Sequence, residues 1–187
     1  MSRTEVRLSG FGGQGIVLAG VLLARAAVLH DNRQATQTQS YGPESRGGAC
    51  VSEVVFSDVP IDYPMAIAPD VLVVMSRDAL ARYGRTLRPG GILIIDDIVP
   101  DMPDRADCTI YRVPATRLAV EKLGRRIVAN VVMLGILVGL TGVVSRKAIE
   151  QAVKESAPRG TEELNLRALR EGFALAETLT PAVEVHA

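Results

Sequence analysis

Short apolar runs alternate with longer helical stretches along most of the chain, an order typical of α/β proteins. Glu5 to Ser9 alternates weakly and is followed by a glycine-rich turn. Ile16 to Leu29 is then rich in Val, Leu and Ala, with no helix breaker after Gly20. The pattern predicts a strand, a turn and a helix at the start of the chain.

Further apolar runs predict the other strands. Val71 to Met75 and Ile92 to Ile95 flank a helical stretch from about Asp78 to Leu87, which predicts a parallel β-α-β unit. Ala49 to Phe56 is predicted as an antiparallel or edge strand. Weaker strand patterns lie at Gln34–Gln39 and Thr109–Val113.

From Ala115 onward the pattern is helical. Ser145 is a candidate N-cap for a helix from Arg146 to Glu155, and Thr161 opens another over Leu164 to Leu179. We therefore expect a single domain over residues 1–187: a Rossmann-like three-layer α/β sandwich with a mostly parallel sheet and a helical C-terminal third.

One segment, Ile127 to Val144, is apolar enough to raise the alternative of a membrane span. Asn130 and Thr141 interrupt it, and its glycines shorten the continuous helix, so a core helix is favoured. We expect a cytoplasmic protein that inserts into no membrane.

Charge and composition argue against several classes of function. Lys plus Arg equals Asp plus Glu at 21 each, so there is no overall basic field to attract nucleic acid. Aromatic residues are only 4% of the chain, which leaves few stacking platforms for bases. Cys50 and Cys108 are the only cysteines and form no metal-binding motif, so neither a zinc site nor an iron–sulfur cluster is expected here.

The first candidate site is the turn Gly10-Phe11-Gly12-Gly13-Gln14-Gly15, which fits the Gly-x-Gly-x-x-Gly pattern between a predicted strand and a predicted helix. Glycines allow positive φ and a close ligand approach, and a helix N-terminus attracts anions. The predicted ligand-binding residues are Gly10, Gly12, Gly13, Gln14 and Gly15.

Two observations limit this prediction. A nicotinamide site needs a carboxylate at the end of the second strand, but Asp31 precedes that strand, whose end carries Thr38, Gln39 and Ser40. Gln14 could serve a ligand or cap the turn. A turn without any ligand remains an alternative.

The second candidate is the loop from Gln39 to Gly48, where a hydroxyl, a phenol, a carboxylate and a guanidinium lie among glycines and a proline. Arg46 can bind a carboxylate or phosphate, with Glu44 orienting it; a solvated surface turn is the alternative. The loop residues assigned to an active site or a partner contact are Ser40, Tyr41, Gly42, Pro43, Glu44, Arg46, Gly47 and Gly48.

Other candidates are weaker. His30 and His186 are the only histidines, and His30 is expected to cap a helix, so a histidine general base has little support. Asp96 and Asp97 end a predicted strand at the sheet edge where α/β sites form, although such a pair is commonly only solvated. No residues of this chain are predicted to be catalytic, and none to bind metal.

Taken together, the glycine turn and the segment Gln37 to Gly48 resemble the gamma subunit of 2-oxoacid:ferredoxin oxidoreductases. Ser57-Asp58, Ile61 to Pro64 and Asn130 to Gly135 are also similar to that family. Gln37-Thr38-Gln39 before the tyrosine looks most like the enzymes for 2-oxoglutarate, with those for branched-chain 2-oxoacids next.

This resemblance implies an enzyme that decarboxylates a 2-oxoacid on thiamine diphosphate, passes electrons through iron–sulfur clusters to ferredoxin and releases an acyl-CoA. Thiamine diphosphate and the clusters would lie on alpha and beta, and possibly delta, subunits, and coenzyme A is a possible ligand of the glycine turn. The alternatives are a stand-alone nicotinamide-dependent oxidoreductase or dinucleotide-binding module, and a scaffold with a ligand-free turn.

Overall fold

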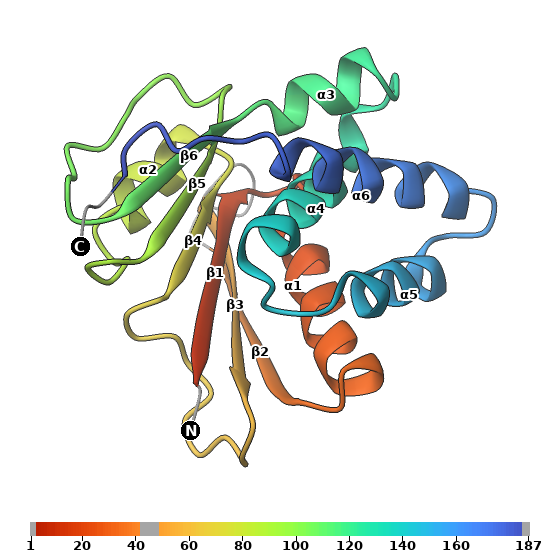
Figure 1. Cartoon of the computed structure of the whole chain (residues 1–187), viewed down its shortest axis with the longest axis horizontal. Helices are drawn as coiled ribbons and strands as arrows, with labels where there is room; N and C mark the ends of the chain where they lie inside the picture. The colour runs from red at the N-terminus through yellow and green to blue at the C-terminus, as the bar shows by residue number, and fades with distance from the viewer. Residues whose placement is uncertain (1–2, 42–48, 185–187) are drawn as a thin grey trace.

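The computed structural model describes residues 3–41 and 49–184, without the side chain of Tyr41. Within these residues six strands form one sheet in the order β2-β3-β1-β4-β5-β6 (Figure 1). The strands are β1 (Thr4–Phe11), β2 (Gln34–Tyr41), β3 (Ala49–Ser57), β4 (Val71–Val74), β5 (Ile92–Asp96) and β6 (Thr109–Val113). The helices are α1 (Ile16–Arg25), α2 (Arg77–Tyr83), α3 (Ala115–Glu121), α4 (Ala129–Thr141), α5 (Arg146–Ser156) and α6 (Glu162–Ala176), with a π-helical turn η1 (Ala26–His30) and a 3-10 turn η2 (Arg126–Val128).

The sheet is mixed, and its parallel part follows the predicted pattern. β1, β4, β5 and β6 pair in parallel, whereas β3 runs antiparallel to both of its neighbours, β1 and β2. The antiparallel strand predicted at Ala49 to Phe56 is therefore confirmed. It lies inside the sheet, and the polar strand β2 occupies the edge.

Alternate residues of the central strands face two separate cores. Val71 and Val73 of β4 pack with α1 and the C-terminal helices, while Leu72 and Val74 pack with α2 on the other face. This period of two, with both faces covered, explains the continuous apolar runs of the parallel strands. The predicted three-layer α/β fold with a helical C-terminal third is confirmed (Figure 1).

Local signals place the helix ends to within a few residues. Ser145 caps α5 as predicted, because its Oγ accepts from the Ala148 amide at 3.1 Å. Thr161 precedes α6, but its side chain makes no capping bond, and α6 ends at Ala176 rather than Leu179. The helix expected to reach Leu87 is shorter, because α2 ends at Tyr83.

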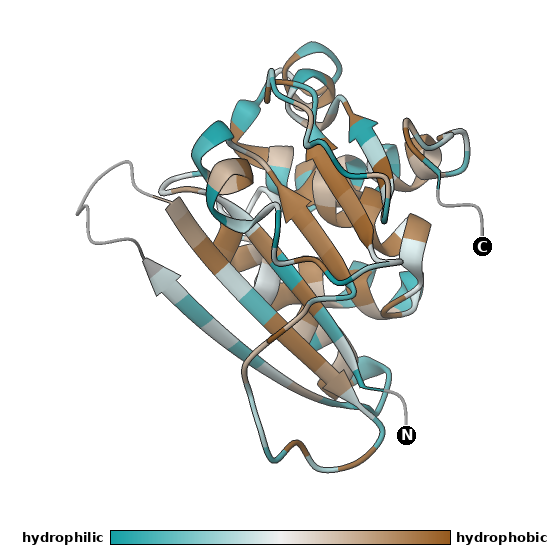
Figure 2. Cartoon of the chain, turned by 90° about the vertical axis from the view of Figure 1, so that its left-hand side faces the viewer, coloured by the Kyte–Doolittle hydropathy of each residue, from teal (hydrophilic) through white to brown (hydrophobic). Residues whose placement is uncertain are grey.

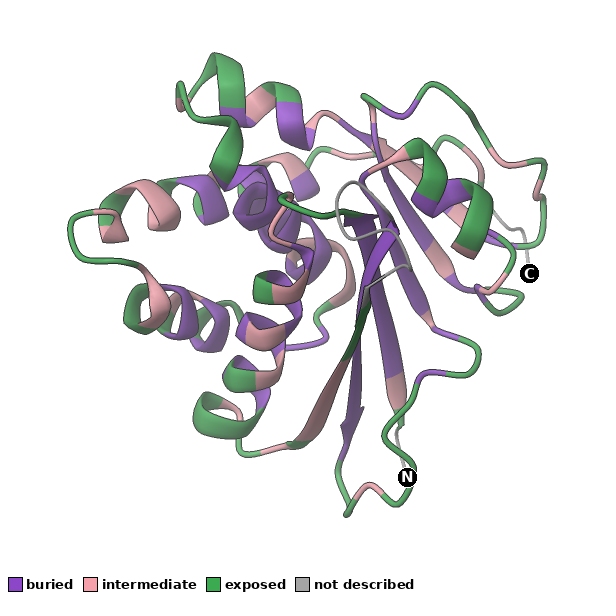
Figure 3. Cartoon of the chain, turned by 180° about the vertical axis from the view of Figure 1, so that it is seen from behind, coloured by how far each residue is buried: buried purple, intermediate pink, exposed green. Residues whose placement is uncertain are grey.

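The apolar segment that raised the membrane alternative contains α4, a core helix. All ten residues from Ala129 to Val138 are buried (Figure 3). In the described part of the chain, no helix is long and apolar enough to cross a membrane.

Glycines let α4 and α6 approach until their backbones touch. A Cβ on Gly135 would lie 2.2 Å from the Leu169 carbonyl oxygen, and a Cβ on Gly172 would lie 2.2 Å from that of Val132. Since a real Cβ never comes so close to a carbonyl oxygen, both positions require glycine at this separation. This contact holds α4 and α6 in place beside α1 and α3.

A buried ion pair joins β1 to β3 on the α2 face of the sheet. Arg7 and Glu53 lie directly opposite each other, and Arg7 Nε donates to Glu53 Oε1 at 2.7 Å. Arg7 also donates to Thr86 Oγ1 at 2.5 Å and to the Ala66 carbonyl at 2.7 Å. The guanidinium therefore meets several partners, which buried charges require.

We predict that Gly135→Ala lowers the free energy of unfolding by about 1–3 kcal/mol, because the new methyl group has no room unless α4 and α6 move apart. Denaturant unfolding measures this loss. The control Lys154→Ala, at an exposed position of α5, should stay within about 0.5 kcal/mol of the parent. Equal stability of Gly135→Ala and the parent would contradict the backbone contact.

Candidate functional site

The glycine turn connects β1 to the N-terminus of α1, as the sequence predicts. Gly10 and Phe11 are the last residues of β1, and Gly15 precedes α1 in a left-handed conformation with φ 73°. No side chain caps α1, and its first turn contains no acidic residue. The first N–H groups of a helix have no intrahelical acceptor, so this end of α1 favours an anion.

Gln14 supports the turn itself. Its Oε1 accepts from the Phe11 amide at 2.8 Å, and its Nε2 donates to the Met75 carbonyl, also at 2.8 Å. Gly10 permits this position, because a Cβ there would lie 2.3 Å from Gln14 Oε1. Of the two roles considered for Gln14, the structure shows the cap.

The other glycines of the turn divide into two kinds. Gly15 is constrained by its neighbours as well as by its φ, since a Cβ would lie 2.3 Å from Asn130 Nδ2. Gly13 is required only for its backbone conformation, because its φ of 97° disfavours other residues. At both Gly12 and Gly13 an added Cβ would meet no atom within 4 Å. The open space at Gly12 and Gly13 is where a ligand can approach the backbone.

Two cavities meet at the turn and share Gly13 and Ile127. The first, of about 260 Å³, lies between the turn, the end of β4 and the region around η2. Its lining residues are Phe11, Gly13, Gln14, Met75, Thr116, Arg126, Ile127 and Ala129. Arg126 gives it a cation beside the N-terminus of α1, which suits a phosphate or carboxylate.

The second cavity, of about 300 Å³, is mostly apolar and lies between α1, α4 and α6. Leu18, Val131 and Leu164 contribute apolar side chains, and Asn130 and Asn165 contribute amides. Asn130 is 4% exposed; its Nδ2 donates to the Gly15 carbonyl at 3.2 Å, while its buried Oδ1 has no partner in the described residues. An unpaired buried acceptor beside a cavity is a candidate contact for a ligand.

Sequence reasoning did not identify Asn130 or Arg126 as site residues. The sequence did mark Asn130 as unusual, because it is a polar residue inside an apolar segment. It did not mark Arg126, since Arg126 is one of many arginines and only the placement of η2 brings it to the turn.

The second candidate loop begins and ends beside the glycine turn. Ser40 is exposed near the end of β2, and Tyr41 is the last residue of that strand. Cys50 pairs with both Gly10 and Tyr41. The last residues of β2, the first residues of β3 and the start of the glycine turn therefore lie at the same end of these neighbouring strands. The predicted residues Gly42, Pro43, Glu44, Arg46, Gly47 and Gly48 lie outside the described residues.

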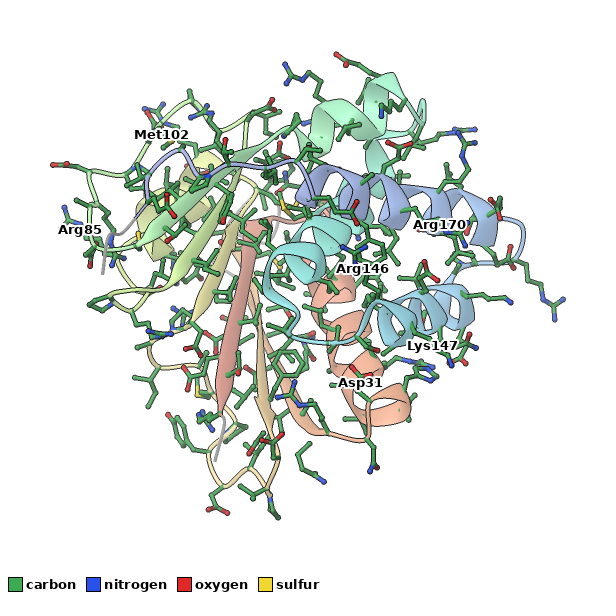
Figure 4. The ribbon with its side chains drawn as sticks, in the orientation of Figure 1. Asp31, Arg85, Met102, Arg146, Lys147 and Arg170 are labelled. Carbon is green, nitrogen blue, oxygen red and sulfur yellow. The ribbon has the colours of Figure 1, made fainter. Side chains whose placement is uncertain are left out.

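Asp31 lies at the other end of α1 and serves a structural contact. Its two carboxylate oxygens accept from the Ser145 amide at 2.7 Å and the Ser145 hydroxyl at 2.6 Å, at the start of α5 (Figure 4). It lines neither of the two cavities. Asp31 therefore cannot act as a ribose carboxylate at the turn.

The alternative interpretation, that Asp96 and Asp97 are only solvated side chains, is wrong for Asp96. Asp96 is 0% exposed, and its carboxylate accepts from the Thr116 hydroxyl and, at 3.3 Å, from the Thr116 amide in the first turn of α3. Burial raises the pKa of Asp96, and the bonds from Thr116 oppose that rise. Asp97 instead pairs with Arg117 at 2.9 Å.

His30, Cys50 and Cys108 lie outside both cavities. His30 is the last residue of η1, with its Nε2 3.3 Å from Glu155 Oε2. Cys50 lies in β3 and Cys108 just before β6, with β1, β4 and β5 between those strands. Burial raises the pKa of each thiol. The other histidine, His186, lies outside the described residues.

A family model described as pyruvate ferredoxin/flavodoxin oxidoreductase matches residues 5–175, which span both cavities. The chain belongs to this family. The match includes the glycine turn, the hairpin loop and α4, the three regions on which the resemblance in sequence rests.

Individual relatives agree with this assignment. The chain is 52% identical to 2-oxoglutarate synthase subunit KorC of Methanocaldococcus jannaschii, over 95% of this chain and 96% of the relative. It is 32% identical to pyruvate synthase subunit PorC of Methanothermobacter thermautotrophicus, over 94% and 97%. The crystal structure of a keto/oxoacid ferredoxin oxidoreductase gamma subunit from Geobacter sulfurreducens superposes with a TM-score of 0.87 at 43% identity, covering 95% and 98%.

The raised pKa of Asp96 predicts a pH-dependent effect of Asp96→Asn. Because the folded chain holds this proton more tightly than the unfolded chain, the stability linked to Asp96 falls as pH rises above its ordinary pKa of 3.8. Asparagine keeps an acceptor for Thr116 and does not ionise. We expect Asp96→Asn to gain stability relative to the parent as pH rises from about 4 to 7, measured by denaturant unfolding.

Asp107→Asn is a control of opposite sign. Hydrogen bonds from Arg105 lower the pKa of Asp107, so its contribution is present above the ordinary pKa and is lost as pH falls. That variant should lose stability relative to the parent as pH rises from about 2 to 4, and the difference should change little between about 4 and 7. A flat or falling difference for Asp96→Asn would contradict the burial argument.

Proposed function

We propose that this chain is the gamma subunit of a 2-oxoglutarate:ferredoxin oxidoreductase, a multi-subunit enzyme that converts 2-oxoglutarate to succinyl-CoA and reduces ferredoxin. The observation that carries the proposal is the difference in identity between relatives of different substrate. The relative named for 2-oxoglutarate is 52% identical and the one named for pyruvate 32% identical, each over nearly the whole chain.

The residues of this chain do not suit the redox cofactors of such an enzyme. An iron–sulfur cluster needs several thiolates, whereas Cys50 in β3 and Cys108 just before β6 are both buried and have β1, β4 and β5 between them. In the described part of the chain no group of three His, Cys, Asp or Glu side chains could hold a metal ion. We assign the clusters and thiamine diphosphate to the alpha and beta subunits, with ferredoxin binding to the assembled enzyme.

Coenzyme A, by contrast, suits the two cavities at the glycine turn. A phosphate group would accept from the free N–H groups at the start of α1 and from Arg126, and apolar parts would enter the second cavity beside Leu18. The unpaired Oδ1 of Asn130 offers an acceptor for a ligand N–H or O–H. When bound, coenzyme A supplies the thiol that accepts the acyl group.

The hairpin loop from Ser40 to Gly48 is proposed to contact a partner subunit or the active site on that subunit. Its support is position: both strands that carry the loop end beside the glycine turn. Tyr41 and Ala49, the described residues that flank the loop, therefore lie at the same end of the sheet as the glycine turn.

The substrate assignment is tested by assembling this chain with alpha and beta subunits from the same organism. We expect CoA-dependent reduction of a viologen dye with 2-oxoglutarate, and a kcat/KM for pyruvate at least about a hundredfold lower, a difference of about 2.7 kcal/mol in transition-state binding. Omitting this chain is the control. A preference for pyruvate or a branched-chain 2-oxoacid would overturn the assignment.

Ligand binding is tested on the full chain by thermal unfolding with coenzyme A. At 100 times its dissociation constant the ligand should stabilise the fold by about 2.7 kcal/mol. Arg126→Ala should weaken binding about tenfold, because it removes a charge-assisted bond to phosphate. Arg125→Ala is the matched control, since the neighbouring Arg125 lines neither cavity.

The remaining alternatives give different results in this titration. A nicotinamide-dependent oxidoreductase would be stabilised by NAD or NADP and not by coenzyme A. A ligand-free scaffold would show no shift with any of the three compounds, and equal effects of the two arginine variants would place the phosphate elsewhere.

A further inference from the structure

The two cavities at the glycine turn adjoin each other, because Gly13 and Ile127 line both of them. Their volumes are about 260 and 300 Å³, at or below the lower end of the usual range for ligand pockets, roughly 300–1,000 Å³. A ligand of cofactor size therefore has to occupy both cavities. The part of it that joins one cavity to the other then lies beside the two shared residues.

The first cavity lies at a point of the fold that suits a ligand. Its wall includes Phe11, the last residue of β1, and Met75, which directly follows β4. β1 and β4 are parallel neighbours, and the helices that follow them pack on opposite faces of the sheet. In open α/β sheets ligands bind in the crevice at such a point. β4 is hydrophobic along its whole length (Figure 2), so polar contacts come from segments beyond the strands.

Ile127 is exposed beside this crevice although the residues that follow it are buried. It is 79% exposed, the largest fraction among the large apolar side chains of the described residues, whereas Val128 is 4% exposed. Its segment is fixed, because the Arg125 amide donates to the Ala119 carbonyl at 3.0 Å and the Val128 amide to the Arg125 carbonyl at 3.3 Å. The fold therefore holds an apolar side chain in water at the junction of the cavities, where a ligand would cover it.

The groups around Ile127 differ between the two cavities. Arg126 lines the first cavity and supplies a cation, whereas the second is mostly apolar and contains Leu18. Beside the second cavity, the buried Oδ1 of Asn130 has no partner in the described residues. One end of the site therefore suits an anion, and the other suits an apolar chain that carries a hydrogen-bond donor.

We propose that Ile127 is a specificity-determining residue of this site, which packs on the part of the ligand that joins a phosphate in the first cavity to an apolar chain in the second. This inference rests on the proposed function and narrows the ligand class to phosphate esters long enough to fill both cavities. Inorganic pyrophosphate can reach Arg126 without spanning the junction. Coenzyme A, with a long chain on its diphosphate, spans it.

Calorimetric titration of the full chain with coenzyme A and with inorganic pyrophosphate tests this division. We expect Ile127→Ala to weaken coenzyme A binding about tenfold, because the apolar contact is lost, and to change pyrophosphate binding less than about twofold. Arg126→Ala should weaken both ligands about tenfold. Ile127→Leu, which keeps the apolar volume, should bind coenzyme A within about threefold of the parent. Because Ile127 is exposed, its variants should melt within about 2 °C of the parent.

A fluorescent reporter tests the contact directly, because the chain contains no tryptophan. In Ile127→Trp, coenzyme A should move the indole emission to shorter wavelength as the ligand covers the ring, and pyrophosphate should not. Val120→Trp is the matched control. Val120 is exposed on the neighbouring helix α3 and lines neither cavity, so its reporter should respond to neither ligand.

The outcomes that overturn this inference differ from a failure of the proposed function. If Ile127→Ala binds coenzyme A like the parent while Arg126→Ala binds it weakly, the ligand assignment stands and Ile127 has no part in selecting the ligand. If Ile127→Ala weakens both ligands equally, its effect lies at the anion position alone. If the Ile127→Trp emission shifts only when other subunits are added, Ile127 belongs to a subunit contact. If the parent binds no coenzyme A, both the ligand assignment and this inference are wrong.

Discussion

The contact between the backbones of α4 and α6 is the constraint on which the candidate site depends. Gly135 and Gly172 bring the two helices so close that α4 lies buried beside α1. From this position the first turn of α4 places Asn130 against the Gly15 carbonyl. The segment just before α4 then places Arg126 and Ile127 along the cavities. A shift of α4 would therefore change the helix packing and the site together.

Some polar groups at the glycine turn already form hydrogen bonds within the chain, whereas others have no partner among the described residues. The Gln14 amide is occupied on both sides by backbone groups, so it holds the turn in shape. The N-terminus of α1 has no side-chain cap, and Asn130 Oδ1 has no partner in the described residues. The turn is thus held by its own hydrogen bonds, and the groups left over are the ones to which the proposed ligand is assigned.

Much of the fold could be predicted from the sequence because its signals are local. The apolar runs of β4 and β5, the cap at Ser145 and the order strand, glycine turn, helix depend on residues close together in the chain. The predictions failed where long-range packing decided. Asp96 was read as solvated, but α3 returns over it and buries its carboxylate. Helix α2 ended earlier than its pattern indicated.

The sequence by itself determined the α/β class, the glycine turn between the first strand and the first helix, and the family resemblance, since each depends on local backbone chemistry or on motif order. Only the tertiary structure decided which residues surround the turn. It assigned Asp31 to the start of α5, brought Asn130 and Arg126 to the cavities and placed β2 at an edge of the sheet. The physical reason is that packing and strand pairing join residues far apart in the chain, and a local sequence pattern does not predict such contacts.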